Sequence, residues 1–167
     1  MKHRVIIGLF IALIGMRPDE SRAQTRAEPP DFAFRFESGV CTTDVMDTFE
    51  TIFTHDVNSD QSPVTSVSLL LPAASMQGIY EAVIDAGFFE YPSDFHVDSG
   101  SLVVPSNHYR LEVRSAGVRH TVFWRDDSGR STAQADRLRS LFKTIESVIR
   151  ERPEVQQRFS GGLVACA

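Results

Sequence analysis

The chain has 167 residues, of which 42% are hydrophobic and 23% are charged, a composition that excludes disordered and fibrous proteins. Its length favours one domain, and twelve Phe residues supply enough large apolar surface for a core. The net charge of −5 argues against a nucleic acid or an anionic membrane surface as the partner.

The N-terminus has the pattern of a secretory signal peptide. Residues 2–4 are basic, and residues 5–16 are an apolar run that is shorter than the roughly 20 residues of a membrane span. Small residues at both ends of segment 21–23 predict cleavage after Ala23, with residues 25–27 as a second candidate site and an uncleaved anchor as the alternative. Loss of residues 1–23 removes four Lys or Arg and two Asp or Glu, which lowers the net charge from −5 to −7. We therefore expect a periplasmic or secreted protein with no stable membrane insertion after cleavage.

Three strands are predicted in the first half of the mature chain. Residues 24–31 are polar and contain a Pro pair, so they are expected to be a flexible lead-in to a single domain over residues 32–158. Every second residue from 32 to 36 is Phe, which is the period of a strand with one buried face. Residues 46–55 and 64–71 predict the second and third strands.

A helix is predicted after the third strand. Ser75 has the position of an N-cap, and Gly87 has that of a left-handed C-cap residue. Between them, Met76, Ile79, Tyr80, Val83 and Ile84 have the spacing of one helical face. Residues 92–107 are predicted to be a loop.

The clearest hairpin signal is the Ala116-Gly117 pair between two alternating segments, 109–113 and 118–124. The register that pairs Arg114 with Arg119 places Tyr109 opposite Trp124 and collects the apolar side chains on one face. It also puts His120 on that face, where we expect a hydrogen-bonded core histidine. The opposite, open face receives five polar side chains: Arg110, Glu112, Arg114, Arg119 and Thr121.

A second amphipathic helix is predicted from the apolar spacing within residues 138–149. Ser131 and Gln134 have the spacing of a capping box at its start, and Pro153 is expected to end it. Residues 159–167 are expected to form an irregular tail.

The order strand, strand, strand, helix, strand, strand, helix predicts an α+β fold, with an antiparallel sheet of about five strands and both helices on one face.

Two cysteines, Cys41 and Cys166, remain in the mature chain. An oxidising compartment permits a disulfide between them, which would tie the tail to the start of the domain. In the chain-entropy model, closing so long a loop stabilises by roughly 4–5 kcal/mol. The alternative is two unpaired thiols.

The sequence predicts no metal and no cofactor. Asp56, Asn58 and Asp60 match the opening of a calcium loop, but Gln61 and Val67 stand where the sharp-turn Gly and the bidentate Glu belong. Zinc-type H-x-x-x-H spacing is absent from the four histidines of the mature chain, His55, His96, His108 and His120. We also find no G-x-S-x-G motif.

The combined motifs resemble a family of exported bacterial domains of unknown function. The matching segments, which cover roughly residues 34–155, are Gly39-Val40-Cys41, Met46-Asp47-Thr48-Phe49, Thr54-x-Asp56, Ile79-Tyr80, Phe88-Phe89-Glu90-Tyr91-Pro92, Tyr109–Val113, Trp124 and Pro153-Glu154. This chain departs from the pattern by an insertion at 59–62 and by lacking a second nearby Cys. The resemblance implies a fold and an extracytoplasmic location, and it implies no activity.

Three functional hypotheses follow. The first is a non-enzymatic binding or inhibitory module that acts on a protein or polysaccharide of the cell envelope through the open sheet face. The second is a structural or stress-related envelope protein. The third is a small envelope hydrolase, which requires a pocket that joins Cys41 or a histidine to a carboxylate such as Asp44 or Asp47. We favour the first, and the sequence defines no oligomeric state.

Overall fold

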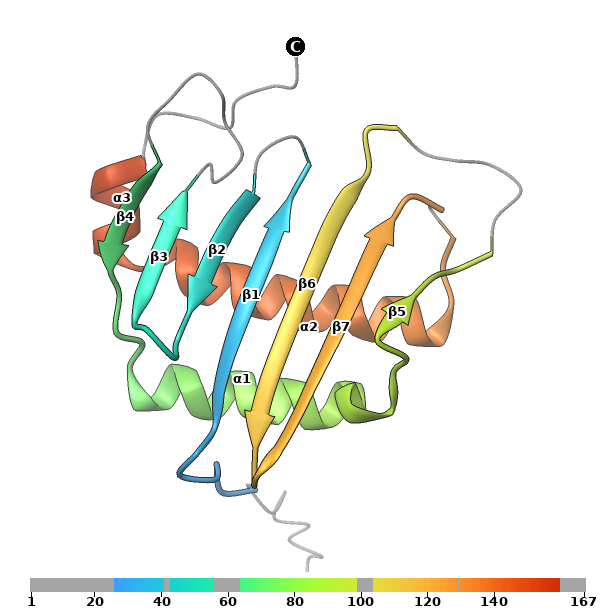
Figure 1. The fold of residues 1–167 in the computed structure, drawn as a ribbon, viewed down its shortest axis with the longest axis horizontal. Coiled ribbons are helices and arrows are strands. Elements are labelled where there is room, and N and C mark those ends of the chain that lie inside the picture. Colours follow the sequence, from blue (N-terminus) through green and yellow to red (C-terminus); the bar gives the residue numbers. More distant parts are fainter. Residues whose placement is uncertain (1–25, 41–42, 56–63, 99–103, 129, 160–167) are drawn as a thin grey trace, which may run out of the picture.

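The structure is a computed structural model that describes residues 26–40, 43–55, 64–98, 104–128 and 130–159, which form one sheet backed by helices (Figure 1). In chain order the elements are β1 (Ala33–Gly39), β2 (Thr43–Asp47), β3 (Ile52–His55), β4 (Thr65–Ser68), α1 (Ala73–Ala86), the 3-10 helix η1 (Phe88–Glu90), β5 (Asp94–Phe95), β6 (Asn107–Ser115), β7 (Val118–Asp126), α2 (Ala133–Arg150) and α3 (Pro153–Phe159). The strand order across the sheet is β4-β3-β2-β1-β6-β7-β5. Neighbouring strands are antiparallel except β5 and β7, which are parallel.

Helices α1 and α2 cover one face of the sheet (Figure 1). Alternation along the strands sends Phe34, Phe36 and Trp124 toward the helices, where all three are almost fully buried. Phe142 of α2 packs on Tyr109 of β6, with ring centroids 4.7 Å apart. The other face carries no helix within the described residues, so the fold leaves one side of the sheet open.

The predicted sheet of about five antiparallel strands with two helices is wrong. The described residues contain seven strands in a mixed sheet and three α-helices, although the broader α+β class is confirmed. The differences lie at three places, and each has a local physical cause.

The predicted second strand, 46–55, is two strands joined by a tight turn. Thr51 has φ +55°, a left-handed conformation that a β-branched residue rarely adopts. Asp47 stabilises the turn, since its carboxylate accepts from the backbone N–H groups of Phe49 at 2.9 Å and Glu50 at 3.2 Å. A turn built without Gly or Pro gives a weak sequence signal.

Two further elements were missed. The two-residue strand β5 lies inside the predicted loop 92–107, where it pairs with Phe123 and Trp124 of β7. Pro153 was expected only to end a helix, but it begins α3, because a proline at the first helical position loses no intrahelical hydrogen bond.

Several local predictions are confirmed. The hairpin of β6 and β7 has the predicted register, with Arg114 opposite Arg119. Gly87 ends α1 in the left-handed conformation, with φ +68°. The predicted N-caps of both helices are wrong. The residue before α1 is Pro72 instead of Ser75. Helix α2 is capped by Thr132 instead of Ser131, and the Thr132 side chain accepts a hydrogen bond from the N–H of Ala135.

Some predictions lie outside the described residues. These are the signal peptide, most of the irregular tail, and both cysteines with their disulfide. The part of the lead-in that is described packs on α1, where Gln77 donates to the Arg26 carbonyl at 2.7 Å and accepts from the Glu28 N–H at 3.0 Å. Among the helices of the described ranges, none has the length and apolar character to cross a membrane.

Candidate binding face of the sheet

The open face is formed by every second residue of the central strands. The open face consists of Arg35, Glu37, Asp47, His108, Arg110, Glu112, Arg114, Arg119, Thr121, Phe123 and Arg125. The five side chains predicted from the hairpin register are all among them. Arg110, Arg114 and Arg119 are exposed, while Glu112 and Thr121 are half-buried.

Ion pairs order the middle of the open face. Arg35 contacts Glu37 at 3.0 Å and Asp47 at 3.1 Å, and Arg119 pairs with Glu112. The sheet register explains these contacts, because Asp47, Arg35 and Glu112 occupy one row across β2, β1 and β6. Exposed pairs of this kind contribute about 0–1 kcal/mol each, so their main effect is to fix the side chains in place.

Phe49, from the turn between β2 and β3, joins the open face although no local sequence pattern predicts it there. The guanidinium carbons of Arg114 and Arg119 lie 5.1 and 5.6 Å from its ring centroid, a cation–π geometry. Together with Arg110 and the paired side chains, Phe49 lines a shallow hollow of about 330 Å³.

Arg110 and Arg125 differ from the other arginines of the open face. Both are exposed, and neither forms an ion pair with any residue that the structure describes. An external carboxylate can therefore reach Arg110 and Arg125 without displacing an internal one. Arg114 also has no ion pair with a described residue, but the Asp31 carbonyl and the Phe49 ring restrain it.

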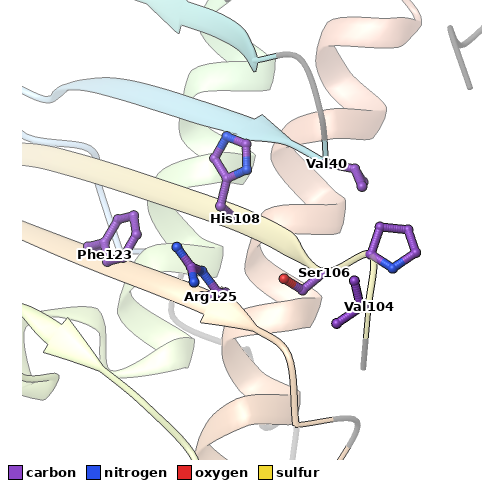
Figure 2. A pocket seen from close by; sticks show the side chains of 7 residues that line it. Val40, Val104, Ser106, His108, Phe123 and Arg125 are labelled. Carbon is purple, nitrogen blue, oxygen red and sulfur yellow. The ribbon is translucent and has the colours of Figure 1, made fainter. Parts of the chain in front are cut away.

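A second hollow, which we call the end pocket, lies where β1 ends and β6 begins (Figure 2). It measures about 440 Å³ and is lined by Val40, Val104, Pro105, Ser106, His108, Phe123 and Arg125. Figure 2 shows His108 on β6 and Arg125 on β7, with Val40 at the end of β1 and Val104 on the segment that leads into β6.

Gly39 of β1 lets His108, which lines the end pocket, contact a residue of β2. It pairs with Thr43 on one side and with His108 on the other, and it has no side chain to separate them. Thr43 Oγ1 therefore lies 2.9 Å from His108 Nε2, across the width of β1. Burial, and after it the positive charge of Arg125, lowers the pKa of His108 below its ordinary value of 6.5, so the ring is neutral at neutral pH.

No protein-family model matches this chain, and no curated protein is significantly similar to it. The resemblance to exported bacterial domains therefore stays a prediction, and function has to be argued from the geometry of the site.

Of the residues proposed for a hydrolase, the structure brings one histidine, His55, together with one carboxylate, Asp44. His55 Nδ1 lies 2.7 Å from Asp44 Oδ1, which is the geometry that orients a histidine. Asp47 is instead on the open face with Arg35, and Cys41 lies outside the described residues. His120 is hydrogen-bonded as expected, with Nε2 2.9 Å from the Tyr91 carbonyl oxygen, but it is half-buried at the margin of the core.

The described ranges contain no group of three or more metal-ligating side chains. His96 is exposed on its own beside β5, and the calcium-loop residues Asp56, Asn58 and Asp60 lie outside the described residues.

Proposed function

We propose that the protein is a non-enzymatic binding module of the cell envelope, an adaptor or inhibitor that docks on another protein through its open face. One observation carries the proposal: exposed guanidinium groups that have no carboxylate partner among the described residues stand on an uncovered sheet face, beside arginines that are already ordered. Arginine is enriched among the residues that dominate protein–protein binding energy, because it combines a planar charge with apolar stem area.

A protein fits this face better than a polysaccharide. Sugar rings are usually held by exposed aromatic side chains that can also hydrogen-bond. The chain has one Trp and three Tyr: Trp124, Tyr80 and Tyr91 are buried, and Tyr109 is half-buried on the helix side of the sheet. Alternating arginines and carboxylates suit the mixed charges of a protein surface instead.

A purely structural role has less support. Large exposed apolar patches would favour self-assembly. Leu70, Val64 and Val118 are the most exposed apolar side chains away from the end pocket. Val64 precedes β4, Leu70 follows it, and Val118 begins β7. Such scattered residues are ordinary on a folded surface.

The proposal is tested by photo-crosslinking in cells that produce the full-length chain. A photoreactive amino acid at Thr121 stands on the open face opposite Glu112, and the same amino acid at the exposed Arg137 of α2 is the matched control. We expect discrete protein adducts from position 121 and none from position 137.

Charge reversal gives the specificity control. Arg110→Glu places a like charge against the partner's carboxylates and is expected to reduce the adduct about tenfold or more, whereas Arg137→Glu leaves its yield unchanged. Equal adducts from positions 121 and 137, or an adduct indifferent to Arg110→Glu, would contradict docking through the open face.

A further inference from the structure

We propose that the end pocket binds a monocarboxylate with a short apolar body, either a free alkyl carboxylate or the carboxyl-terminal residue of a polypeptide. This inference goes beyond the proposed function, because the pocket can take a free carboxylate whether or not the open face docks on a protein.

Several exposed hydrophobic side chains gather around the pocket. Of the seven large hydrophobic residues that are exposed in the described ranges, three line it: Val40 at 41%, Val104 at 83% and Phe123 at 40%. A single exposed apolar side chain is ordinary, but three around one hollow give a ligand a surface to cover. The volume of about 440 Å³ lies in the range of small-molecule sites.

The polar end of the pocket is supplied by Arg125, whose guanidinium forms no ion pair with a described residue. A guanidinium presents parallel N–H donors that match both oxygens of a carboxylate. The hydroxyl of Ser106 lines the same hollow and can donate a further hydrogen bond. An apolar wall beside one fixed cation selects a ligand with an apolar body and an anionic head.

The charge of the pocket favours a carboxylate over a phosphate. Among the described lining residues Arg125 is the only cationic one, since the lowered pKa of His108 keeps its ring neutral and its Nε2 is engaged by Thr43. One positive charge balances a monoanion, whereas a dianionic phosphate is normally held by several cations or a cluster of backbone N–H groups.

The inference is tested with the mature chain and three probes: acetate, butanoate and hexanoate. Binding is followed by NMR through the His108 ring signals and quantified by titration. We expect affinity to rise by about fourfold for each methylene group that the pocket buries. Arg125→Gln is expected to weaken hexanoate binding at least about tenfold, and Arg137→Gln, which removes the same charge from α2, to leave it unchanged.

A second variant separates the apolar contribution from the charge. Phe123→Thr keeps a strand-forming residue and is expected to leave acetate binding unchanged while it reduces the gain from acetate to hexanoate. The unmodified chain provides an independent readout if Arg125→Gln fails to fold. After burial, the positive charge of Arg125 contributes to the lowered pKa of His108. Bound hexanoate neutralises that charge, so we expect the pKa of His108 to rise when hexanoate binds.

The source of the carboxylate is decided by a pair of peptides that end in Leu, one as the free acid and one as the amide. If hexanoate binds and competes with the free-acid peptide, the pocket accepts both sources. If the free-acid peptide alone binds, the ligand is a polypeptide C-terminus. Equal binding of the acid and the amide, no binding of any probe, or hexanoate binding unaffected by Arg125→Gln would overturn the inference.

Discussion

The arginines of the open face differ in how they are restrained. Arg35 is held by two carboxylates, and Arg119 by Glu112 and the Phe49 ring, so both are oriented before any partner arrives. Arg110 and Arg125 have no such restraint from the described residues. Pre-oriented side chains lose less conformational entropy on docking, whereas unpaired ones gain new charge-assisted hydrogen bonds. The open face therefore favours docking in two ways, through a small entropy loss at Arg35 and Arg119 and through new hydrogen bonds at Arg110 and Arg125.

One acidic residue fixes the hairpin that presents these arginines. Asp31 accepts hydrogen bonds from the N–H groups of Ala116 and Gly117, each at 2.8 Å, and its carbonyl accepts from Arg114 Nε at 3.1 Å. Both turn residues have positive φ. Two-residue turns with this backbone conformation match the right-handed twist of the strands that they join. Asp31 thus orients the turn and one of the arginines together.

We predict that Asp31→Asn lowers the melting temperature at neutral pH. The hydrogen bond from Gly117, with that from Ala116 and the charge of Arg114, lowers the pKa of Asp31 below 3.8. A lowered carboxyl pKa contributes stability that is present above 3.8 and lost as the pH falls through the folded-state pKa. The difference between variant and parent should therefore vanish in strong acid. Thermal unfolding at several pH values measures it, with the exposed Asp85→Asn as the control; equal melting temperatures at neutral pH would contradict the role of Asp31.

At the scale of elements, structure that depends on residues close in sequence could be predicted, whereas pairing between distant segments could not. The hairpin of β6 and β7 follows from a two-residue turn and alternating side chains, both of which are local in sequence. The parallel pairing of β5 with β7 joins Asp94 to Phe123 and has no local signal in a two-residue strand. Pro153 was ambiguous, because a proline both ends one helix and begins another.

The same division holds for the candidate site. Arg110, Arg114 and Arg119 were assigned to the open face from the pleat alone, and their exposure is observed. Arg35 and Asp47 were missed because they join that face through pairing of β1 with β2 and β6, which no local pattern specifies. The alternation of Phe34 and Phe36 with Arg35 and Glu37 was the signal that placed Arg35 on a solvent face, but not beside the hairpin.

The start of α2 offers a direct test at this scale. Thr132 Oγ1 accepts from the Ala135 N–H at 3.1 Å, so Thr132→Ala is expected to destabilise the fold by about 1 kcal/mol. Ser131→Ala is the matched control, since the Ser131 hydroxyl contacts Asp136 and no backbone N–H; we expect a change within about 0.5 kcal/mol. Urea unfolding of both variants measures the difference. If Ser131→Ala lowered the free energy of unfolding more than Thr132→Ala, Ser131 and not Thr132 would be the N-cap of α2.

Across the whole molecule, the two faces of the sheet have different electrostatic environments. On the open face, exposed arginines stand among half-buried carboxylates, which allows pairing with a partner of mixed charge. On the helix side, Glu146 of α2 is held between the sheet and Arg150, with its side chain only 28% exposed. Burial raises the pKa of Glu146 above 4.5, although Arg150 and a hydrogen bond with Ser38 act in the opposite direction. Desolvation therefore outweighs the ion pair there.

This balance makes the stability of the fold depend on pH in a direction opposite to that of Asp31. Because the folded-state pKa of Glu146 is raised, its contribution is fully present below pH 4.5 and is lost as the pH rises through the folded-state pKa. Glu146→Gln keeps a partner for Ser38 and cannot ionise, so we predict that it stabilises the fold at neutral pH. The lost pair with the exposed Arg150, at 3.9 Å, offsets at most about 0.5 kcal/mol.

The measurement is the free energy of urea unfolding of parent and variant across the acid and neutral range. The expected gain is less than about 1 kcal/mol at neutral pH and disappears in acid, where Glu146 is protonated in both folded and unfolded states. Arg150→Gln serves as the companion variant: by removing the only nearby cation that lowers the pKa of Glu146, it should destabilise the neutral-pH fold and steepen the pH dependence. A Glu146→Gln chain that is less stable than its parent at neutral pH would show that the Arg150 pair outweighs desolvation.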